Sequence, residues 1–140
     1  YLFSDKKKYN EEDLKRYLEN NESLAFLACY NMSDQVYFGN LRIYQLSPGI
    51  LSFGRLIGDL KFKGLGYGTK MTKVALDLCF NRFNAEMILV GNREKNLASL
   101  SSKKKLGFMK AENHLIEELG YQISKFKNCF YMKKETYLKD

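Results

Sequence analysis

Short runs of apolar residues alternate with polar turns through the first half of the chain. Residues 23–30, 36–46 and 50–60 are rich in aromatic and β-branched side chains and are separated by clusters of turn-forming residues. The pattern therefore predicts three consecutive antiparallel strands. Gly54 and Gly58 fall inside the third of them, where glycine is costly, and they predict a bulge or a close backbone approach.

The period of the apolar residues is helical in two other segments. Residues 11–20 form a predicted helix that follows a capping pair, Asn10 and Asp13. A second predicted helix runs from Thr69 to Asn84, with apolar residues recurring every three or four positions. Its predicted buried face consists of Met71, Val74, Ala75, Leu78 and Cys79.

The second half of the chain predicts a mixture of strands and helices. Residues 87–91 are short and apolar, as in a buried parallel strand. A helix is expected from Asn96, as its cap, to Lys105, ended by Gly107 at the C′ position. Residues 108–113 and 128–137 are the last predicted strands, with an irregular or helical link between them. The whole order indicates an α/β or α+β fold on a mixed sheet.

The positive net charge favours an anionic partner but does not indicate which kind. The net charge of +7 and the isoelectric point of about 9.2 suit nucleic acid, an acidic membrane surface or a phosphorylated small molecule. Two lysine runs, at 6–8 and 103–105, supply much of this charge and predict solvated faces. No basic-aromatic motif of a nucleic-acid reader is present, so nucleic acid is the least favoured of these partners.

Cysteine and histidine usage predicts a protein without a disulfide framework or a metal site. Cys29, Cys79 and Cys129 are odd in number and widely spaced, and His114 is the single histidine. This usage is typical of the reducing cytoplasm. No apolar stretch reaches the roughly 20 residues that a membrane-spanning helix needs.

Three alternate glycines, Gly64, Gly66 and Gly68, separate the third predicted strand from the helix that follows. Their spacing matches neither the P-loop nor the dinucleotide-binding fingerprint, so ATP hydrolysis and NAD chemistry are not supported. Glycines at such a junction can take positive φ, and the helix N-terminus attracts phosphate. The segment is therefore either a diphosphate site, helped by the charges of Lys61, Lys63 and Lys70, or a tight connection needed only for packing.

The segment "RLIGDLKFKGLGYGTKM" (55–71) resembles the acetyl-coenzyme A loop of the GNAT acetyltransferases, whose consensus is Gln/Arg-x-x-Gly-x-Gly/Ala. Here the consensus begins with Lys63 instead of glutamine or arginine. Two further segments, "NLASLSSKKKLGF" (96–108) and "YFGNLRI" (37–43), are similar to motifs of a branch that acts on nucleotide-linked amino sugars and ribosomal-protein N-termini.

The resemblance implies a GNAT-like fold and an acetyl-CoA site. We expect a mixed, mostly antiparallel sheet of six or seven strands with a splayed central parallel pair, flanked by helices. We expect one acetyltransferase domain over residues 1–140, with the family's first strand lying before Tyr1. By this resemblance the pantetheine arm meets the backbone of the third strand, the loop amides hold the pyrophosphate, and the later helix contributes two polar side chains. The predicted cofactor-binding residues are Leu60, Phe62, Lys63, Gly64, Leu65, Gly66, Tyr67, Gly68, Thr69, Asn96 and Ser99.

The expected function is acetyl transfer from acetyl-CoA to a primary amine, possible acceptors being a nucleotide-linked amino sugar or another small molecule. The alternatives are a protein N-terminal acetyltransferase and a catalytically silent CoA-binding module. The proton-transfer groups of many relatives are missing, because Lys103 and Ser52 stand where a tyrosine and a glutamate are expected. No catalytic residue is assigned; the candidate substitutes are Asp59, Ser101, Ser102, His114 and Tyr131.

Overall fold

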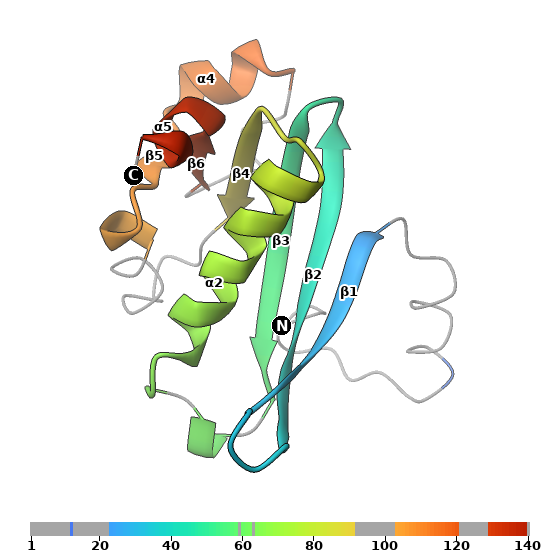
Figure 1. The fold of residues 1–140 in the computed structure, drawn as a ribbon. Coiled ribbons are helices and arrows are strands. Elements are labelled where there is room, and N and C mark those ends of the chain that lie inside the picture. Colours follow the sequence, from blue (N-terminus) through green and yellow to red (C-terminus); the bar gives the residue numbers. More distant parts are fainter. Residues whose placement is uncertain are drawn as a thin grey trace. The chain divides into compact units, whose positions relative to one another are not determined.

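In the described part of the chain the sheet holds six strands in the order β1-β2-β3-β4-β6-β5 (Figure 1). The computed structural model describes residue 12 and residues 23–58, 60–62, 64–91, 103–120 and 129–139. Its contacts divide the chain into two compact units, residues 1–45 with 53–75 and residues 46–52 with 76–140. The predicted helix at 11–20 lies outside the described residues apart from Glu12.

Strands β1 (Ser23–Tyr30) and β2 (Tyr37–Ser47) form an antiparallel pair in the first unit, which confirms the predicted hairpin. Their register places Leu27 opposite Leu41. The turn between them closes where the Gln35 N–H donates to the Asn31 carbonyl at 2.8 Å. Leu41 is buried while Leu27 is 36% exposed, so β1 leaves part of its apolar surface uncovered by the described residues.

Strand β3 (Ile50–Ile57) is shorter than the predicted strand at 50–60. A short 3-10 helix, η1 (Leu60–Phe62), follows it, so the extended backbone ends at Ile57. A bulge or a close backbone approach was predicted at Gly54 and Gly58. At Gly58 the N–H donates to the Phe38 carbonyl at 2.8 Å, so the two backbones approach closely there. A closer approach occurs at Gly39 and none at Gly54. A Cβ atom built on Gly39 would lie 2.0 Å from the Leu56 carbonyl oxygen, whereas one on Gly54 meets no described atom within 4 Å.

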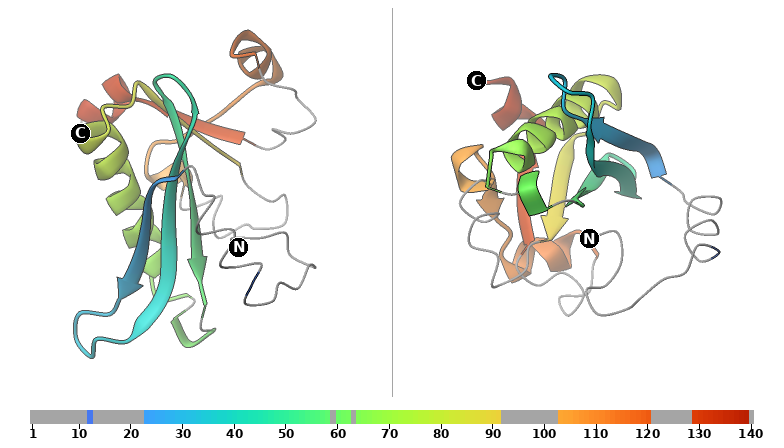
Figure 2. Two further views of the ribbon diagram at one scale, coloured as in Figure 1. Left: turned by 90° about the vertical axis from the view of Figure 1, so that its right-hand side faces the viewer. Right: turned by 90° about the horizontal axis from the view of Figure 1, so that it is seen from below.

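Helix α2 (Tyr67–Asp77) runs along one face of strands β1 to β3 (Figure 2). It begins two residues before the predicted start and continues into a π-helical segment, η2 (Leu78–Arg82). Its buried face includes Met71, Ala75 and Cys79, as predicted. Val74 was wrongly placed on that face, because it is 48% exposed and the buried stripe turns toward Thr72.

The second unit contains the parallel strand that the sequence predicts. Strand β4 (Met87–Gly91) runs parallel to β3, with Ile50 opposite Met87 and Leu51 opposite Ile88. On its other side β4 pairs antiparallel with β6 (Cys129–Lys133), which in turn pairs with β5 (Met109–Lys110). The mixed, mostly antiparallel sheet of the expected fold is therefore confirmed.

Both final strands are shorter than predicted. The segment 108–113 contributes only β5, because helix α4 (Asn113–Glu118) begins at Asn113. The segment 128–137 changes from β6 to helix α5 (Lys134–Leu138) at Lys134. A buried cluster of Leu89, Ala111, Ile116 and Cys129 packs α4 against β4 and β6.

The predicted helix end at Gly107 is confirmed. Gly107 has φ +101, and its N–H donates to the Lys104 carbonyl while the Phe108 N–H donates to the Lys103 carbonyl. This pair of bonds is a Schellman motif, which satisfies the last carbonyls of the helix. No helix in the described part of the chain is long and apolar enough to cross a membrane.

Candidate functional site

The glycine turn before α2 has the backbone conformation that the sequence predicts. Gly64 and Gly66 have φ +77 and +86, values that side chains with a Cβ atom rarely adopt. Both are exposed, and a Cβ atom built on either would meet no described atom within 4 Å. The space beside these two glycines is therefore open to a ligand.

The start of helix α2 places a series of amide groups next to this turn. The Lys70 N–H donates to the Gly66 carbonyl at 3.1 Å and opens the helical ladder. The N–H groups of Tyr67 and Gly68 precede that bond, in the part of a helix where amides lack intrahelical acceptors and the dipole attracts anions. This arrangement suits a phosphate group.

The third glycine has a different role from the other two. Gly68 lies inside the first turn of α2 and does not have positive φ. A Cβ atom built on it would lie 3.2 Å from Nη1 of Arg55, so the guanidinium occupies the space that a side chain would need. Nη1 of Arg55 donates to the Gly68 carbonyl and, at 2.5 Å, to Oγ1 of Thr72.

Aromatic packing fixes both ends of the turn. The rings of Phe62, from η1, and Tyr67, from α2, lie with centroids 5.4 Å apart, and both pack on Phe38 of β2 at 5.5 and 4.6 Å. The Tyr67 hydroxyl also accepts a hydrogen bond from the Asn31 side chain. These contacts occupy the Phe62 and Tyr67 side chains, so their backbones are the groups left for the predicted ligand role.

The lysines predicted to add charge near the turn are only partly placed. Lys61 and Lys70 are exposed, with Nζ 5.1 Å from the Phe62 ring centroid and 5.7 Å from the Tyr67 ring centroid. Lys63 lies outside the described residues, as do Asn96 and Ser99. Leu60 and Phe62 lie in η1 and not on β3, so the extended backbone expected to pair with a pantetheine arm ends before them.

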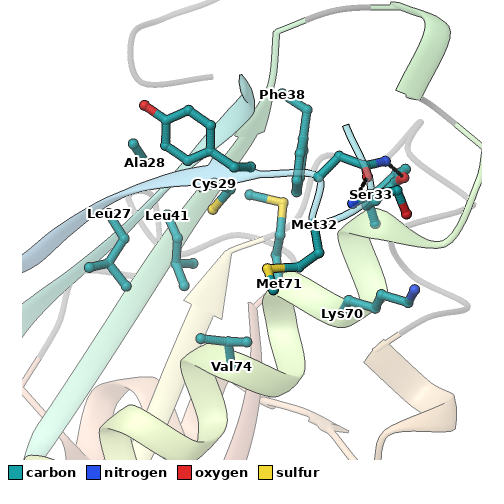
Figure 3. A pocket seen from close by; sticks show the side chains of 13 residues that line it. Leu27, Ala28, Cys29, Met32, Ser33, Phe38, Leu41, Lys70, Met71 and Val74 are labelled. Carbon is teal, nitrogen blue, oxygen red and sulfur yellow. Dashed lines mark hydrogen bonds between the residues drawn. The ribbon is translucent and has the colours of Figure 1, made fainter. Parts of the chain in front are cut away.

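A cavity of about 560 Å³ lies between the end of β1, the turn after it and α2 (Figure 3). Its walls are mainly apolar and include Leu27, Cys29, Met32, Phe38, Met71 and Val74. Lys70 is the one charged side chain among its lining residues in the described part of the chain. The cavity can accommodate an apolar group, and its described walls offer no carboxylate for an ammonium group.

The groups considered for proton transfer lie in varied surroundings. His114 is exposed on α4, and the hydroxyl of Tyr131 on β6 contacts Sδ of Met109 at 3.8 Å. Ser52 on β3 is 3% exposed. Asp59, Ser101 and Ser102 lie outside the described residues.

Lys103 is not part of a solvated face, which corrects the expectation for the run at 103–105. Its side chain is 5% exposed, and its Nζ donates to the Gly91 carbonyl at 3.0 Å, at the end of β4. Lys104 and Lys105 are exposed, as predicted. A charge run at a helix end gave no sign that one lysine would turn inward.

The cysteines are protonated thiols at neutral pH. Burial raises the pKa of Cys29 and Cys129, and it raises the pKa of Cys79 to about 12. None forms a disulfide. Within the described ranges, histidine, cysteine and carboxylate side chains form no group of three that could hold a metal ion.

Comparison with known proteins identifies the family. The model of the acetyltransferase (GNAT) domain family matches residues 2–109, which is most of the chain. The chain therefore belongs to the GNAT acetyltransferase family and is an acyltransferase. A search of curated proteins found no match.

Solved structures share the fold at low sequence identity. A chimera of the spermidine N-acetyltransferase SpeG from Vibrio cholerae and hSSAT is 19% identical, covers 93% of this chain and 78% of its own, and has a TM-score of 0.70. The dodecameric spermidine N-acetyltransferase from Vibrio cholerae is 19% identical with a TM-score of 0.67, covering 91% and 74% of the two chains. A GNAT acetyltransferase from Bacillus anthracis is 14% identical with a TM-score of 0.69, covering 91% and 76%.

Proposed function

We propose that this chain is an acetyl-CoA-dependent N-acetyltransferase and that the turn from Gly64 to Thr69 holds the pyrophosphate of the coenzyme. GNAT acetyltransferases use acetyl-CoA as the acetyl donor. The single observation that carries the assignment to this turn is its geometry. Two exposed glycines with positive φ leave open space directly before the N-terminus of an eleven-residue helix.

The residues present fit a diphosphate. The amides of Tyr67 and Gly68 precede the first helical hydrogen bond and would donate to phosphate oxygens. The Thr69 amide follows them in the chain and remains a predicted contact. Gly64 and Gly66 would let the backbone approach those oxygens, since a side chain at either position would extend into the same space. Lys63, Asn96 and Ser99 remain predicted contacts.

The coenzyme would supply an acetyl thioester whose thiolate is a good leaving group. The chain's own contribution is then mainly to hold the neutral amine against the acetyl carbonyl, and such positioning supplies roughly 7–11 kcal/mol in well-oriented reactions. We assign no general base or acid.

For the acceptor we propose a small molecule with a primary amine, and a nucleotide-linked amino sugar in particular. The net charge of +7 supports a phosphorylated acceptor. The solved spermidine N-acetyltransferases support the broader class of small amines, since they share this fold. A protein N-terminus is the alternative acceptor, and we place the reaction in the cytoplasm, where free thiols persist.

A second candidate function is a CoA-binding module without turnover. It is favoured by Lys103, which stands where many relatives carry a tyrosine and whose Nζ is bound to the Gly91 carbonyl. It is also favoured by Ser52, which stands in the place of a glutamate and is buried. Both candidates predict CoA binding, and they differ in acetyl transfer.

The test compares two glycines that share a backbone conformation. Gly66 and Gly120 have φ +86 and +84, and a Cβ atom on either meets no described atom within 4 Å. Gly66→Val and Gly120→Val should therefore suffer similar backbone strain, on the order of 1–2 kcal/mol. Only Gly66→Val should lose CoA binding in isothermal titration calorimetry, because its side chain lies where the coenzyme approaches.

Equal CoA affinity in Gly66→Val and the wild type would rule out this turn as the pyrophosphate site. Acetyl transfer is then measured by thiol release with a UDP-linked amino sugar, spermidine and a ribosomal-protein N-terminal peptide. Transfer to the amino sugar alone supports the proposed acceptor. CoA binding without release with any of the three favours the silent module.

A further inference from the structure

We infer that the cavity beside helix α2 is a second ligand site, which takes a small aromatic molecule that carries one carboxylate. All the residues that line the cavity belong to the first compact unit, residues 1–45 with 53–75. Neither the family match nor the proposed acetyl transfer assigns a ligand to this cavity. The inference therefore goes beyond the proposed function.

The cavity has the size and the exposure of a small-molecule site. Its volume of about 560 Å³ lies within the range of known ligand pockets. Figure 3 shows Leu27 of β1 on one side of this space and Met71 and Val74 of α2 on the other. Leu27, Val74 and Met32 remain exposed, although all three are large apolar side chains. Exposed apolar side chains gathered around one cavity are typical of a binding surface.

The side chains around the cavity favour an aromatic ligand over an aliphatic one. The rings of Phe38 and Tyr67 pack on each other with centroids 4.6 Å apart, and both residues line the cavity. Three sulfur-bearing residues, Cys29, Met32 and Met71, line it as well. Aromatic rings gain from contacts with other rings and with sulfur atoms, and a methionine side chain adapts its shape to the ring that it meets.

The polar groups of the turn next to the cavity are bound to each other. The Asn31 side chain donates to the Tyr67 hydroxyl and accepts a hydrogen bond from the Ser33 N–H at 2.8 Å. Asp34 is not a lining residue, and its Oδ1 accepts a hydrogen bond from the Val36 N–H at 3.3 Å. These bonds hold the turn in place, so the charge of the ligand is selected by another group.

That group is Lys70, the one charged residue among those that line the cavity in the described ranges. Lys70 is exposed, and its Nζ lies 5.7 Å from the Tyr67 ring centroid. Burial raises the pKa of Cys29, so this thiol adds no negative charge at neutral pH. An ammonium group beside an apolar space attracts a carboxylate on an apolar ligand and repels a second ammonium group.

The test is an NMR titration of the full chain that follows isotope-labelled methionine methyl groups. The probes are cinnamate, the neutral cinnamamide and the positively charged cinnamylamine. Met32 and Met71 line the cavity, whereas Met87, Met109 and Met132 lie in the second unit and serve as internal controls. We expect cinnamate to shift only the first two methyl groups. It should bind about threefold more tightly than cinnamamide, as for an exposed ion pair, and cinnamylamine should bind most weakly.

Three outcomes of this titration overturn the inference. Cinnamate may leave the methyl groups of Met32 and Met71 unshifted, it may shift all five methionines equally, or cinnamylamine may bind as tightly as cinnamate. The last outcome would show that the cavity does not select a negative charge.

Two tryptophan variants locate the ligand. Val74 and Lys73 are neighbouring exposed residues of α2, and only Val74 lines the cavity. Val74→Trp should weaken cinnamate binding at least tenfold because the new ring occupies the cavity, whereas Lys73→Trp should bind cinnamate like the wild type. Lys70→Met should weaken cinnamate binding about threefold and leave cinnamamide binding unchanged. Equal cinnamate affinity in the two tryptophan variants, or an equal effect of Lys70→Met on both probes, contradicts the inference.

A last measurement separates this site from the coenzyme site, since CoA also carries an aromatic base and negative charges. The cinnamate titration is repeated with saturating CoA. We expect the shifts of Met32 and Met71 to persist, with an affinity for cinnamate at most about threefold weaker. Complete displacement of cinnamate by CoA would overturn the inference of a second site. If the wild type does not bind CoA, the proposed function fails, while the response to cinnamate still tests the cavity.

Discussion

Two positively charged side chains in this protein each donate a hydrogen bond to the carbonyl of a glycine, and we expect the two bonds to have different consequences. Arg55 donates to Gly68 at the start of α2, and Lys103 donates to Gly91 at the end of β4. Arg55 is half-buried and also contacts a hydroxyl, whereas Lys103 is 5% exposed. The first contact lies beside the turn that we propose as the coenzyme site, and the second involves a buried lysine side chain and the exposed last residue of β4.

The difference teaches how to separate site residues from structural ones. A bond that holds the first turn of a helix beside the proposed ligand site can influence binding, because it fixes backbone that would lie next to the ligand. A bond made by a buried lysine mainly stabilises the fold, since a buried charged group needs hydrogen-bond partners. The Arg55 contact should therefore appear in affinity measurements, and the Lys103 contact in unfolding measurements.

The largest expected effect on stability belongs to Lys103→Met. The apolar side chain keeps most of the length but loses the hydrogen bond from the charged Nζ to the Gly91 carbonyl, so we expect a loss of about 2 kcal/mol in the free energy of unfolding. Urea unfolding followed by circular dichroism measures it. Lys104→Met is the matched control, because Lys104 is exposed and should change stability by less than about 0.5 kcal/mol.

The comparison fails if both lysine variants unfold at the same urea concentration. In that case the inward position of Lys103 would contribute no stability. CoA affinity provides the complementary measurement, and we expect Lys103→Met to reduce it less than Arg55→Gln does.

A smaller effect is expected when the two glycines, Gly68 and Gly91, are each replaced by alanine. A Cβ atom on Gly68 would crowd Arg55, whereas one on Gly91 meets no described atom within 4 Å. We expect Gly68→Ala to weaken CoA binding by about 1 kcal/mol, close to fivefold, without unfolding the protein, because alanine also favours the helix.

Gly91→Ala should leave both the affinity for CoA and the unfolding midpoint close to those of the wild type. Calorimetry and urea unfolding of the two variants side by side provide the check. Equal CoA affinity in the two variants would show that Arg55 can move without disturbing the turn.

The sequence predicted the glycines of the proposed ligand site better than the arginine that packs beside them. Strand β1 was predicted to the residue, and the positive φ of Gly64 and Gly66 followed from the glycine spacing alone. Arg55 was missed because its partners lie 13 and 17 residues away and leave no periodic signal. Lys103 was misread because lysines in the last turn of a helix usually face solvent.

Helix α2 shows the limit of periodicity in the same way. Val74 fits the apolar spacing but is 48% exposed, while Thr72 is buried because its hydroxyl bonds Arg55 and the Gly68 carbonyl. A polar residue with hydrogen-bond partners took a core position that hydrophobicity would give to a valine. The spacing of apolar residues identifies the helix, but polar contacts decide its rotation.

The smallest expected effect is a loss of stability at alkaline pH. Its cause differs from that of the Lys103 effect, so the two must be measured separately. Burial raises the pKa of Cys79 to about 12 from its ordinary value of 9.0, because the thiolate is poorly solvated in the interior. The folded state thus holds this proton more tightly than the unfolded state. The stabilisation is complete below pH 9 and is lost as the pH rises from about 9 toward 12.

At pH 10 the Cys79 contribution to this loss is about 1 kcal/mol relative to pH 7. Urea unfolding of the wild type and of Cys79→Ala at pH 7, 8, 9 and 10 measures it, with slopes against pH compared because the substitution also changes packing. The slope should be shallower in Cys79→Ala, and parallel slopes would show that this thiol does not set the alkaline limit. Since Cys79 causes no loss of stability well below pH 9, the Lys103 and Lys104 variants should be compared near pH 7, where their difference reports the Lys103–Gly91 contact.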